Sequence, residues 1–193
     1  MGRRKGPPLT RVHVVQAALA VVREEGPAAL GVSRVARELG IRPPSLYNHV
    51  GSGEALAQAA VTEATRRLLT HLRASLDDVS EPRAQLLALA HAVRHWVGNN
   101  PGWYALMARV EPDNDHPEFG PVVRDMLSLF GRPLEQLGVP PESRVHALRG
   151  LRSAVHGFVL LEASGQFQLP EDLDESFRRM VEAMLRGVEG TVF

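Results

Sequence analysis

The chain has 193 residues, and its 22 basic side chains balance its 22 acidic ones, so its formal net charge is zero. It contains no cysteine, which excludes a disulfide scaffold, a cysteine-based zinc module and a thiol nucleophile. No apolar run approaches the ~18 residues of a membrane span, and the N-terminus lacks the apolar stretch of a signal peptide. We therefore expect a soluble cytoplasmic protein.

The zero net charge hides an asymmetry along the chain. Residues 1–50 carry eight basic and three acidic side chains, whereas residues 51–193 carry 14 basic and 19 acidic ones. A basic N-terminal part joined to an acidic remainder indicates a polyanion partner for the N-terminal part. A short segment can also differ from neutrality by chance, so charge alone does not decide the function.

The periodicity of apolar residues predicts nine helices and no strand, and therefore an all-α fold. In the first helix, Leu9, Val12, Val15, Leu19 and Val22 recur at spacings of three and four, and Gly26 with Pro27 ends it. The expected helices lie near residues 9–25, 33–39, 44–50, 54–77, 81–98, 101–110, 118–136, 141–164 and 172–188. Ser80 is expected to cap the helix near 81–98.

Residues 33–50 have the pattern of a helix-turn-helix. Val35, Ala36 and Leu39 form one face of a short helix, and Gly40 provides a left-handed cap at its end. Ile41 then enters the core as the chain turns. The alternative is an ordinary helical hairpin with a solvated polar side, which the basic flanks make less favourable.

The second helix of this pair has a face suited to reading the DNA major groove. Leu46 and Val50 point inward, while small and polar residues at its N-terminus point roughly the other way. Such a face can contact base edges, with Asn48 suited to adenine. The residues expected to contact DNA are Arg3, Arg4, Lys5, Ser33, Arg34, Arg42, Pro44, Ser45, Tyr47, Asn48 and His49.

The segment from Val35 to Ile41, together with Leu46 to Val50 and Glu54 to Leu56, resembles the DNA-binding domain of tetracycline-repressor (TetR) family regulators. The nine-helix count extends the resemblance to the whole length. The resemblance implies a helix-turn-helix domain at 1–53 and a ligand-binding and dimerisation domain at 54–193. It also implies a regulator, most simply a repressor, that binds a palindromic operator as a homodimer and is released by a small apolar ligand.

Two positions depart from the family pattern. Gly31 stands where the family usually has a capping Thr, so we expect Ser33 to serve as the cap. Gly53 stands where the family commonly has a phosphate-binding Lys, so the basic N-terminal arm is expected to compensate.

The resemblance also implies a ligand cavity in the body of the protein. The residues expected to line it are Trp96, Trp103, Tyr104, Met107, Met126, Phe130, His156 and Phe158. The alternative is a filled core, because aromatic and Met residues at helical spacing are more often core than pocket. His156 and Gly157 are similar to a His-Gly pair in one TetR subgroup, and Gly157 within a helix predicts close helix approach or pocket space.

The last two predicted helices carry more apolar residues than one chain is expected to bury. In the family these helices form a four-helix bundle with their symmetry mates, so we expect a homodimer. The residues in question are Val145, Leu148, Val155, Val159, Phe177, Val181, Met184 and Leu185.

Three rival interpretations have weaker support. His91 and His95 lie one helical turn apart, but no acidic residue completes a zinc pattern, so no metal site is expected. The chain lacks a dinucleotide fingerprint and a nucleophile elbow, so we expect neither an enzyme nor a cofactor. The live alternative is a dimeric DNA-binding regulator that senses no small molecule.

Overall fold

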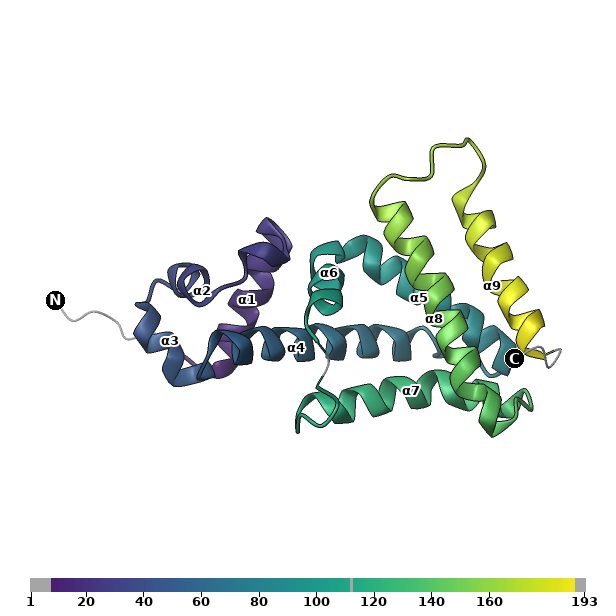
Figure 1. The fold of residues 1–193 in the computed structure, drawn as a ribbon, viewed down its shortest axis with the longest axis horizontal. Helices are drawn as coiled ribbons and strands as arrows, with labels where there is room; N and C mark the ends of the chain where they lie inside the picture. Colours follow the sequence, from purple (N-terminus) through teal and green to yellow (C-terminus); the bar gives the residue numbers. More distant parts are fainter. Residues whose placement is uncertain (1–7, 112, 190–193) are drawn as a thin grey trace. The chain divides into compact units, whose positions relative to one another are not determined.

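The computed structural model describes residues 8–111 and 113–189. Within these ranges it has nine α-helices, one 3-10 turn and no strand, which confirms the predicted all-α fold (Figure 1). The elements are α1 (Arg11–Glu25), η1 (Pro27–Ala29), α2 (Val32–Glu38), α3 (Pro43–Val50), α4 (Gly53–Ala74), α5 (Pro82–Asn99), α6 (Pro101–Arg109), α7 (Phe119–Gln136), α8 (Pro141–Ala163) and α9 (Leu173–Glu189). None of the described helices is long and apolar enough to span a membrane.

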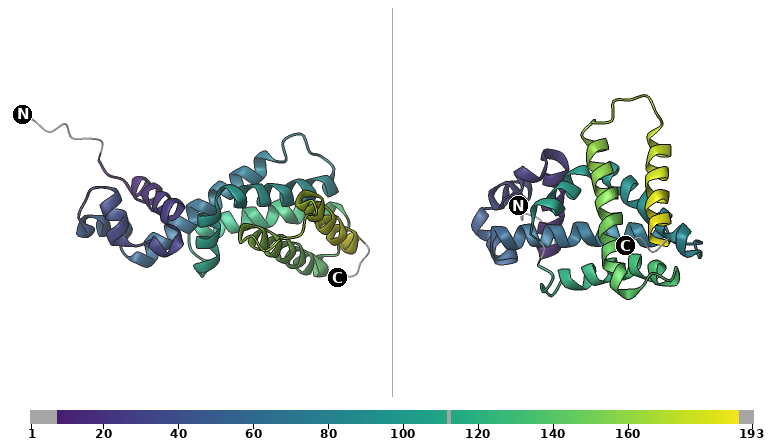
Figure 2. Two further views of the ribbon diagram at one scale, coloured as in Figure 1. Left: turned by 90° about the horizontal axis from the view of Figure 1, so that it is seen from above. Right: turned by 45° about the vertical axis from the view of Figure 1, so that its right-hand side comes forward.

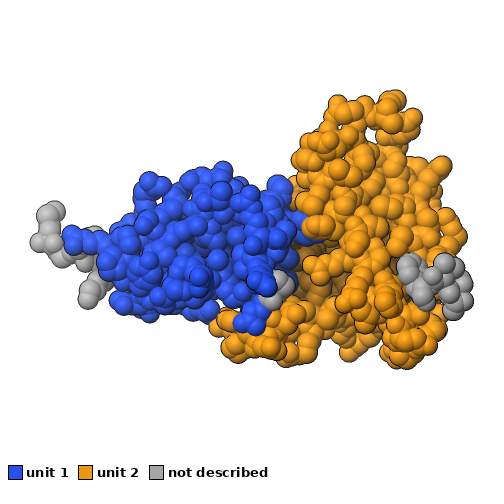
Figure 3. All heavy atoms as spheres, viewed as in Figure 1, with its two compact units in different colours: residues 1–66, 100–113 blue, residues 67–99, 114–193 orange. Residues whose placement is uncertain are grey.

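The chain divides into two compact units (Figure 3). The N-terminal unit comprises residues 1–66 and 100–113, and the C-terminal unit comprises residues 67–99 and 114–193. Helix α4 therefore contributes to both units, and α6 belongs to the N-terminal unit although α5 and α7 belong to the other. The predicted domain boundary at residue 54 stays a prediction.

Helix α1 supplies much of the core of the N-terminal unit, because Val14, Ala18 and Val21 are fully buried. Its start is fixed by a reciprocal cap. The Thr10 hydroxyl accepts a hydrogen bond from the His13 backbone N–H, and the His13 ring accepts one from the Thr10 N–H. This arrangement satisfies donors that an α-helix leaves unpaired at its first turn.

The turn between α2 and α3 has the expected glycine geometry. Gly40 has a φ of 65°, in the left-handed region where other residues are strained. The backbone N–H of Ile41 then donates to the carbonyl of Ala36, which closes the turn. Helix α2 packs against both α1 and α3, so the predicted helix-turn-helix is present.

Two predicted caps are wrong. Helix α2 begins at Val32 after Gly31, with no side-chain cap, and Ser33 lies inside the helix and not before it. Helix α5 begins at Pro82, so Glu81 takes the place predicted for Ser80 and its carboxylate accepts from the backbone N–H of Arg83. A Glu side chain one residue closer to the helix reaches these donors, which removes the need for the serine.

Helix α5 is the centre of the C-terminal unit, where it packs against α7, α8 and α9, and α8 and α9 lie side by side (Figure 2). The Arg94 guanidinium joins three of these helices. It donates to Glu162 of α8 at 2.8 Å and 2.6 Å and lies 2.9 Å from Asp174 of α9. Its central carbon is 5.4 Å and 5.0 Å from the ring centroids of Phe158 and Phe177.

Five of the eight apolar residues of α8 and α9 that were expected to need a partner chain are buried within one chain. Val155, Val159, Phe177, Val181 and Leu185 are each at most 5% exposed. These five residues therefore give no argument for a dimer. Val145 is exposed and Leu148 and Met184 are half-buried, so one chain leaves three of the eight accessible even though α5 packs against both helices.

Three large apolar residues of α8 are exposed, of which Val145 is among the eight. Val145, Leu160 and Leu161 are 51%, 40% and 46% exposed. A Cβ built on Gly157 would meet nothing within 4 Å, so close helix approach within the chain does not explain this glycine.

Candidate nucleic-acid interface

Helix α3 presents one face to the core and the opposite face to solvent. Leu46 is fully buried and Val50 is 7% exposed, which fixes the rotation of the helix. Pro44, Ser45, Tyr47 and Asn48 are all exposed, as predicted from the helical spacing. Their exposure on a helix held by its other side is what contact with base edges in the major groove requires.

The start of α3 has few backbone donors for a phosphate. Pro43 and Pro44 occupy the first two helical positions, and neither has a backbone N–H. The backbone N–H of Ser45 donates to the carbonyl of Arg42 at 2.9 Å. Contacts at this end of the helix therefore depend on side chains, of which that of Arg42 is exposed and cationic.

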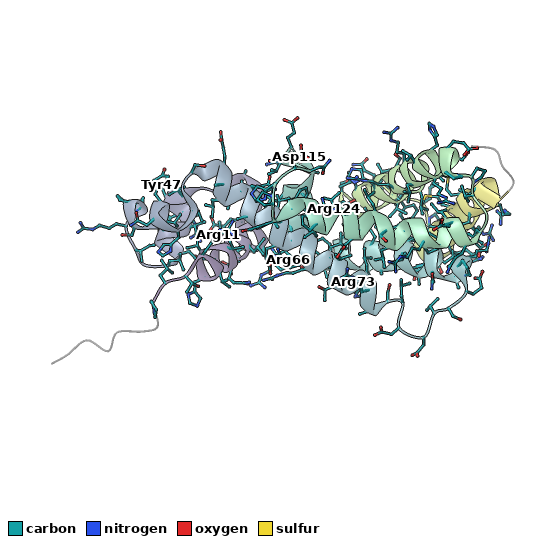
Figure 4. The ribbon with its side chains drawn as sticks, turned by 90° about the horizontal axis from the view of Figure 1, so that it is seen from below. Arg11, Tyr47, Arg66, Arg73, Asp115 and Arg124 are labelled. Atoms are coloured by element: carbon teal, nitrogen blue, oxygen red, sulfur yellow. The ribbon has the colours of Figure 1, made fainter. Side chains whose placement is uncertain are left out.

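The side chains that flank the reading face differ in accessibility. Tyr47 is 47% exposed on the surface of the N-terminal unit (Figure 4), so its hydroxyl can reach a phosphate. His49 is half-buried, and Ser33 on α2 is exposed. Arg3, Arg4 and Lys5 were also predicted to contact DNA, but they lie outside the described residues.

Arg34 has a structural role within the N-terminal unit. Its Nε donates to Glu25 of α1 at 2.8 Å, and its Nη1 donates to Glu38 of α2 at 2.9 Å. The hydrogen bonds from Arg34 lower the pKa of Glu25, so this carboxylate stays ionised at a more acidic pH than an unpaired glutamate would. The Arg34 side chain is only 17% exposed and is bonded to two carboxylates, so it holds α2 against α1. This arrangement disfavours the predicted phosphate contact.

The beginning of α4 lacks the lysine that is common at the position of Gly53 in the TetR family. The Ser52 hydroxyl accepts a hydrogen bond from the Ala55 backbone N–H at 3.0 Å and so caps the helix. Gly53 is exposed and has no side chain with which to hold a phosphate.

The residues predicted to line a ligand cavity are divided between the two units. Trp103, Tyr104 and Met107 lie on α6 in the N-terminal unit, and the Trp103 indole N–H donates to the carbonyl of Leu19 at 2.8 Å. The other five lie in the C-terminal unit, namely Trp96, Met126, Phe130, His156 and Phe158. Their role in ligand binding stays a prediction.

Sequence reasoning missed two polar groups of the C-terminal unit. Arg94 joins three helices, but its partner Glu162 is 68 residues away and no local pattern relates them. His71 stacks on His95 at 5.7 Å, and its buried Nε2 has no hydrogen-bond partner among the described residues. Within the described ranges, no three His, Asp or Glu side chains gather as metal ligands would.

Two family models match the chain. Residues 14–60 match "Bacterial regulatory proteins, tetR family", and residues 86–184 match "Tetracyclin repressor-like, C-terminal domain". The chain belongs to the TetR family. It is therefore a DNA-binding transcriptional regulator of this family and not an enzyme.

Relatives and solved structures agree with the family models. The chain is 31% identical over 185 residues to an HTH-type transcriptional regulator, YobS of Bacillus subtilis, which covers 93% of each chain. It is 33% identical to one from Mycobacterium tuberculosis, over 94% of this chain and 82% of the relative. A protein from Rhodococcus is similar in fold, with a TM-score of 0.81, 19% identity and coverage of 97% of this chain and 100% of that one.

Two further TetR-like structures are complexes with a bound partner. BioQ with its double-stranded DNA operator has a TM-score of 0.71 and 23% identity, and covers 95% of this chain and 99% of that chain. A TetR variant from Acinetobacter baumannii in complex with minocycline also has a TM-score of 0.71, with 24% identity and coverage of 95% and 98%. At these identities the similarity describes the fold of this chain alone.

Proposed function

We propose that this TetR-family protein acts in the cytoplasm as a repressor that binds a palindromic operator as a homodimer and leaves it when a small apolar ligand binds. The observation that carries the proposal is the exposed face of α3, with Pro44, Ser45, Tyr47 and Asn48 accessible around a helix anchored by Leu46. Asn48 is suited to pair with an adenine edge, Pro44 to pack on a thymine methyl, and Tyr47 to hold a phosphate.

We propose a homodimer because one N-terminal unit has a single reading helix. One reading helix contacts a single stretch of major groove, and a palindromic site presents two such stretches about 34 Å apart. On α8, the exposed Leu160 and Leu161 provide apolar surface for a second copy. The outward side of α9 is instead occupied by ion pairs of Arg178 with Glu175 and Glu182. We therefore assign most of the apolar contact between copies to α8.

The proposal that a ligand releases the operator is supported by residues of the C-terminal unit and by similar solved structures. Five of the aromatic, Met and His residues predicted to line a cavity lie in this unit, and the buried Nε2 of His71 offers a polar group to a ligand. The similar TetR variant is described with minocycline, and similar BioQ with an operator. The alternative, a dimeric regulator that senses no small molecule, predicts the same DNA binding and differs only in this unit.

Selection of bound sequences from random duplex DNA tests the DNA-binding part of the proposal. We expect a palindrome to be enriched. Asn48→Ala should weaken binding by about 1–3 kcal/mol and relax the preference at one position of each half-site, whereas Tyr47→Ala should weaken binding to all duplexes alike. Asn99→Ala, an equivalent change on α5 in the C-terminal unit, is the control. Enrichment of no duplex, or indifference to both α3 variants, contradicts the proposal.

The ligand part is tested with the selected duplex. Apolar and aromatic compounds that raise the melting temperature of the free protein are titrated into the protein–duplex complex. A compound at a hundred times its Kd should stabilise the protein by about 2.7 kcal/mol. By reciprocity, a compound that releases the duplex must bind less tightly when the duplex is present. Compounds that bind and leave the complex intact favour the regulator without a small-molecule ligand.

A further inference from the structure

Arg42 occupies the N-cap position of α3 without capping the helix. Its backbone is extended, with φ −82° and ψ 144°, and its side chain forms no hydrogen bond with the first turn. Helices usually begin after Ser, Thr, Asp or Asn, whose short side chains accept from backbone N–H groups of the first turn. In the same unit, Thr10 and Ser52 serve α1 and α4 in this way. A guanidinium can only donate, so the Arg42 side chain cannot replace such a cap.

The N-cap position is also electrostatically unfavourable for a cation. Aligned peptide dipoles give the N-terminus of a helix a partial positive charge, which favours carboxylates and opposes an arginine there. The Arg42 side chain is exposed, and among the described residues it has no hydrogen-bond or ion-pair partner to offset this effect. Arg34 of the same unit is instead bonded to Glu25 and Glu38. A residue that departs from the local rules for a helix start without compensation in the fold is expected at a functional site.

The two prolines after Arg42 limit what this end of α3 can contact. The residue before a proline is restricted to extended conformations, so Pro43 holds the backbone of Arg42 in the observed geometry. Neither Pro43 nor Pro44 has an N–H, and the N–H of Ser45 is bonded to the carbonyl of Arg42. The first three residues of α3 therefore lack the free backbone donors with which a helix start holds a phosphate. This end of the helix is suited to base edges and not to the DNA backbone.

A guanidinium at this position matches one base in particular. In the major groove guanine presents two acceptors, O6 and N7, and the donors of an arginine can bond to both at once. The other exposed side chains of α3 suit other groups, since Asn48 fits adenine and Pro44 fits a thymine methyl. His49 is half-buried, so within the described part of the chain Arg42 is the exposed cation at the reading helix.

We propose that Arg42 is a specificity-determining residue that reads one guanine in each half-site of the operator. Its guanidinium donates two hydrogen bonds, one to O6 and one to N7 of this base. The guanine lies close to the thymine that Pro44 contacts, because the two residues are adjacent at the start of α3. The inference rests on the proposed function, since α3 must lie in the major groove. It adds to the half-site a base that neither Asn48 nor Pro44 recognises.

Replacement of guanine by 7-deazaguanine, which still pairs with cytosine but lacks the N7 acceptor, tests this contact in the selected palindrome. Each guanine of the half-site is replaced in turn, in both half-sites. Wild-type affinity should fall at least about fivefold at one of these positions, because the bidentate contact becomes a single bond. Arg42→Ala should bind the unmodified duplex at least about fivefold less tightly. At that position it should no longer distinguish the two bases, whereas independent effects would multiply.

Arg23→Ala is the matched control, because Arg23 is an exposed arginine of the same unit in the last turn of α1. It removes the same charge and should keep the discrimination against 7-deazaguanine. The assignment of Arg42 is overturned if the wild type tolerates replacement of every guanine, or if Arg42→Ala keeps the discrimination. Equal weakening of all duplexes by Arg42→Ala also overturns it, because that result belongs to a phosphate contact. Failure to enrich any duplex contradicts the proposed function instead.

Discussion

At the scale of single residues, Arg94 and Arg178 illustrate how solvent exposure determines what an ion pair contributes to the stability of the fold. Arg94 is 14% exposed and bonded to carboxylates from two other helices, whereas the side chain of Arg178 is 44% exposed and pairs only along its own helix. Hydrogen bonds of Arg178 hold the pKa of Glu175 at about 2, yet in water such pairs add little to folding.

Arg94→Met is therefore expected to lower the free energy of unfolding by about 2 kcal/mol, because Glu162 loses its charged partner in a partly buried site. Arg178→Met should change it much less. Urea denaturation of both variants measures the difference. The double variant Arg94→Met with Glu162→Met should recover part of the loss, since no carboxylate is then left unpaired at that site. Equal losses for Arg94→Met and Arg178→Met would contradict this ranking.

At the scale of elements, local signals in the sequence were sufficient for some helices and misleading for others. Apolar periodicity and the glycine at position 40 located α1 and the helix-turn-helix, because both are local properties, although Val12, predicted on the inner face of α1, is 65% exposed. The Arg34 clamp was missed, because Glu25 is nine residues away and on another helix. The placement of α6 with α1 depends on packing between distant segments, which no local pattern contains.

The same distinction applies to the dimer surface. Apolar residues on α8 and α9 seemed from the sequence to need a partner chain, but packing against α5 buries most of them, and the most exposed that remain are Val145, Leu160 and Leu161 of α8. A substitution meant to separate the copies of the proposed dimer should therefore be placed on the exposed residues of α8.

Leu160→Glu combined with Leu161→Glu is expected to weaken the dimer by at least about tenfold, because each carboxylate would lose its water in the contact. Sedimentation over a range of protein concentrations measures the change. Leu127→Glu on α7 is the matched control, since Leu127 is 53% exposed and lies outside α8. A dimer that survives the double substitution, or dissociates equally with Leu127→Glu, places the contact elsewhere.

At the scale of the whole molecule, the basic first 50 residues and the acidic remainder determine which part of the chain can approach DNA. A net-neutral chain whose first 50 residues carry an excess of base attracts DNA with one part only, and the acidic remainder is repelled by phosphate. In the proposed homodimer two such basic parts would face one operator, so we expect binding to depend on the distance between its half-sites as well as on their sequence.

Insertion of about five base pairs between the two half-sites of the selected palindrome turns one half-site to the opposite side of the duplex. We expect affinity to fall toward that of a single half-site, because the second reading helix α3 can no longer enter its groove. Titration of the dimer with both duplexes measures the effect. An insertion of about ten base pairs, one full helical turn, returns both half-sites to the same side of the duplex but lengthens the distance between them by about 34 Å. If the proposed homodimer presents its two α3 helices at a single spacing, that site is also bound weakly. Full recovery of affinity at the longer spacing would argue against a single spacing of the two reading helices.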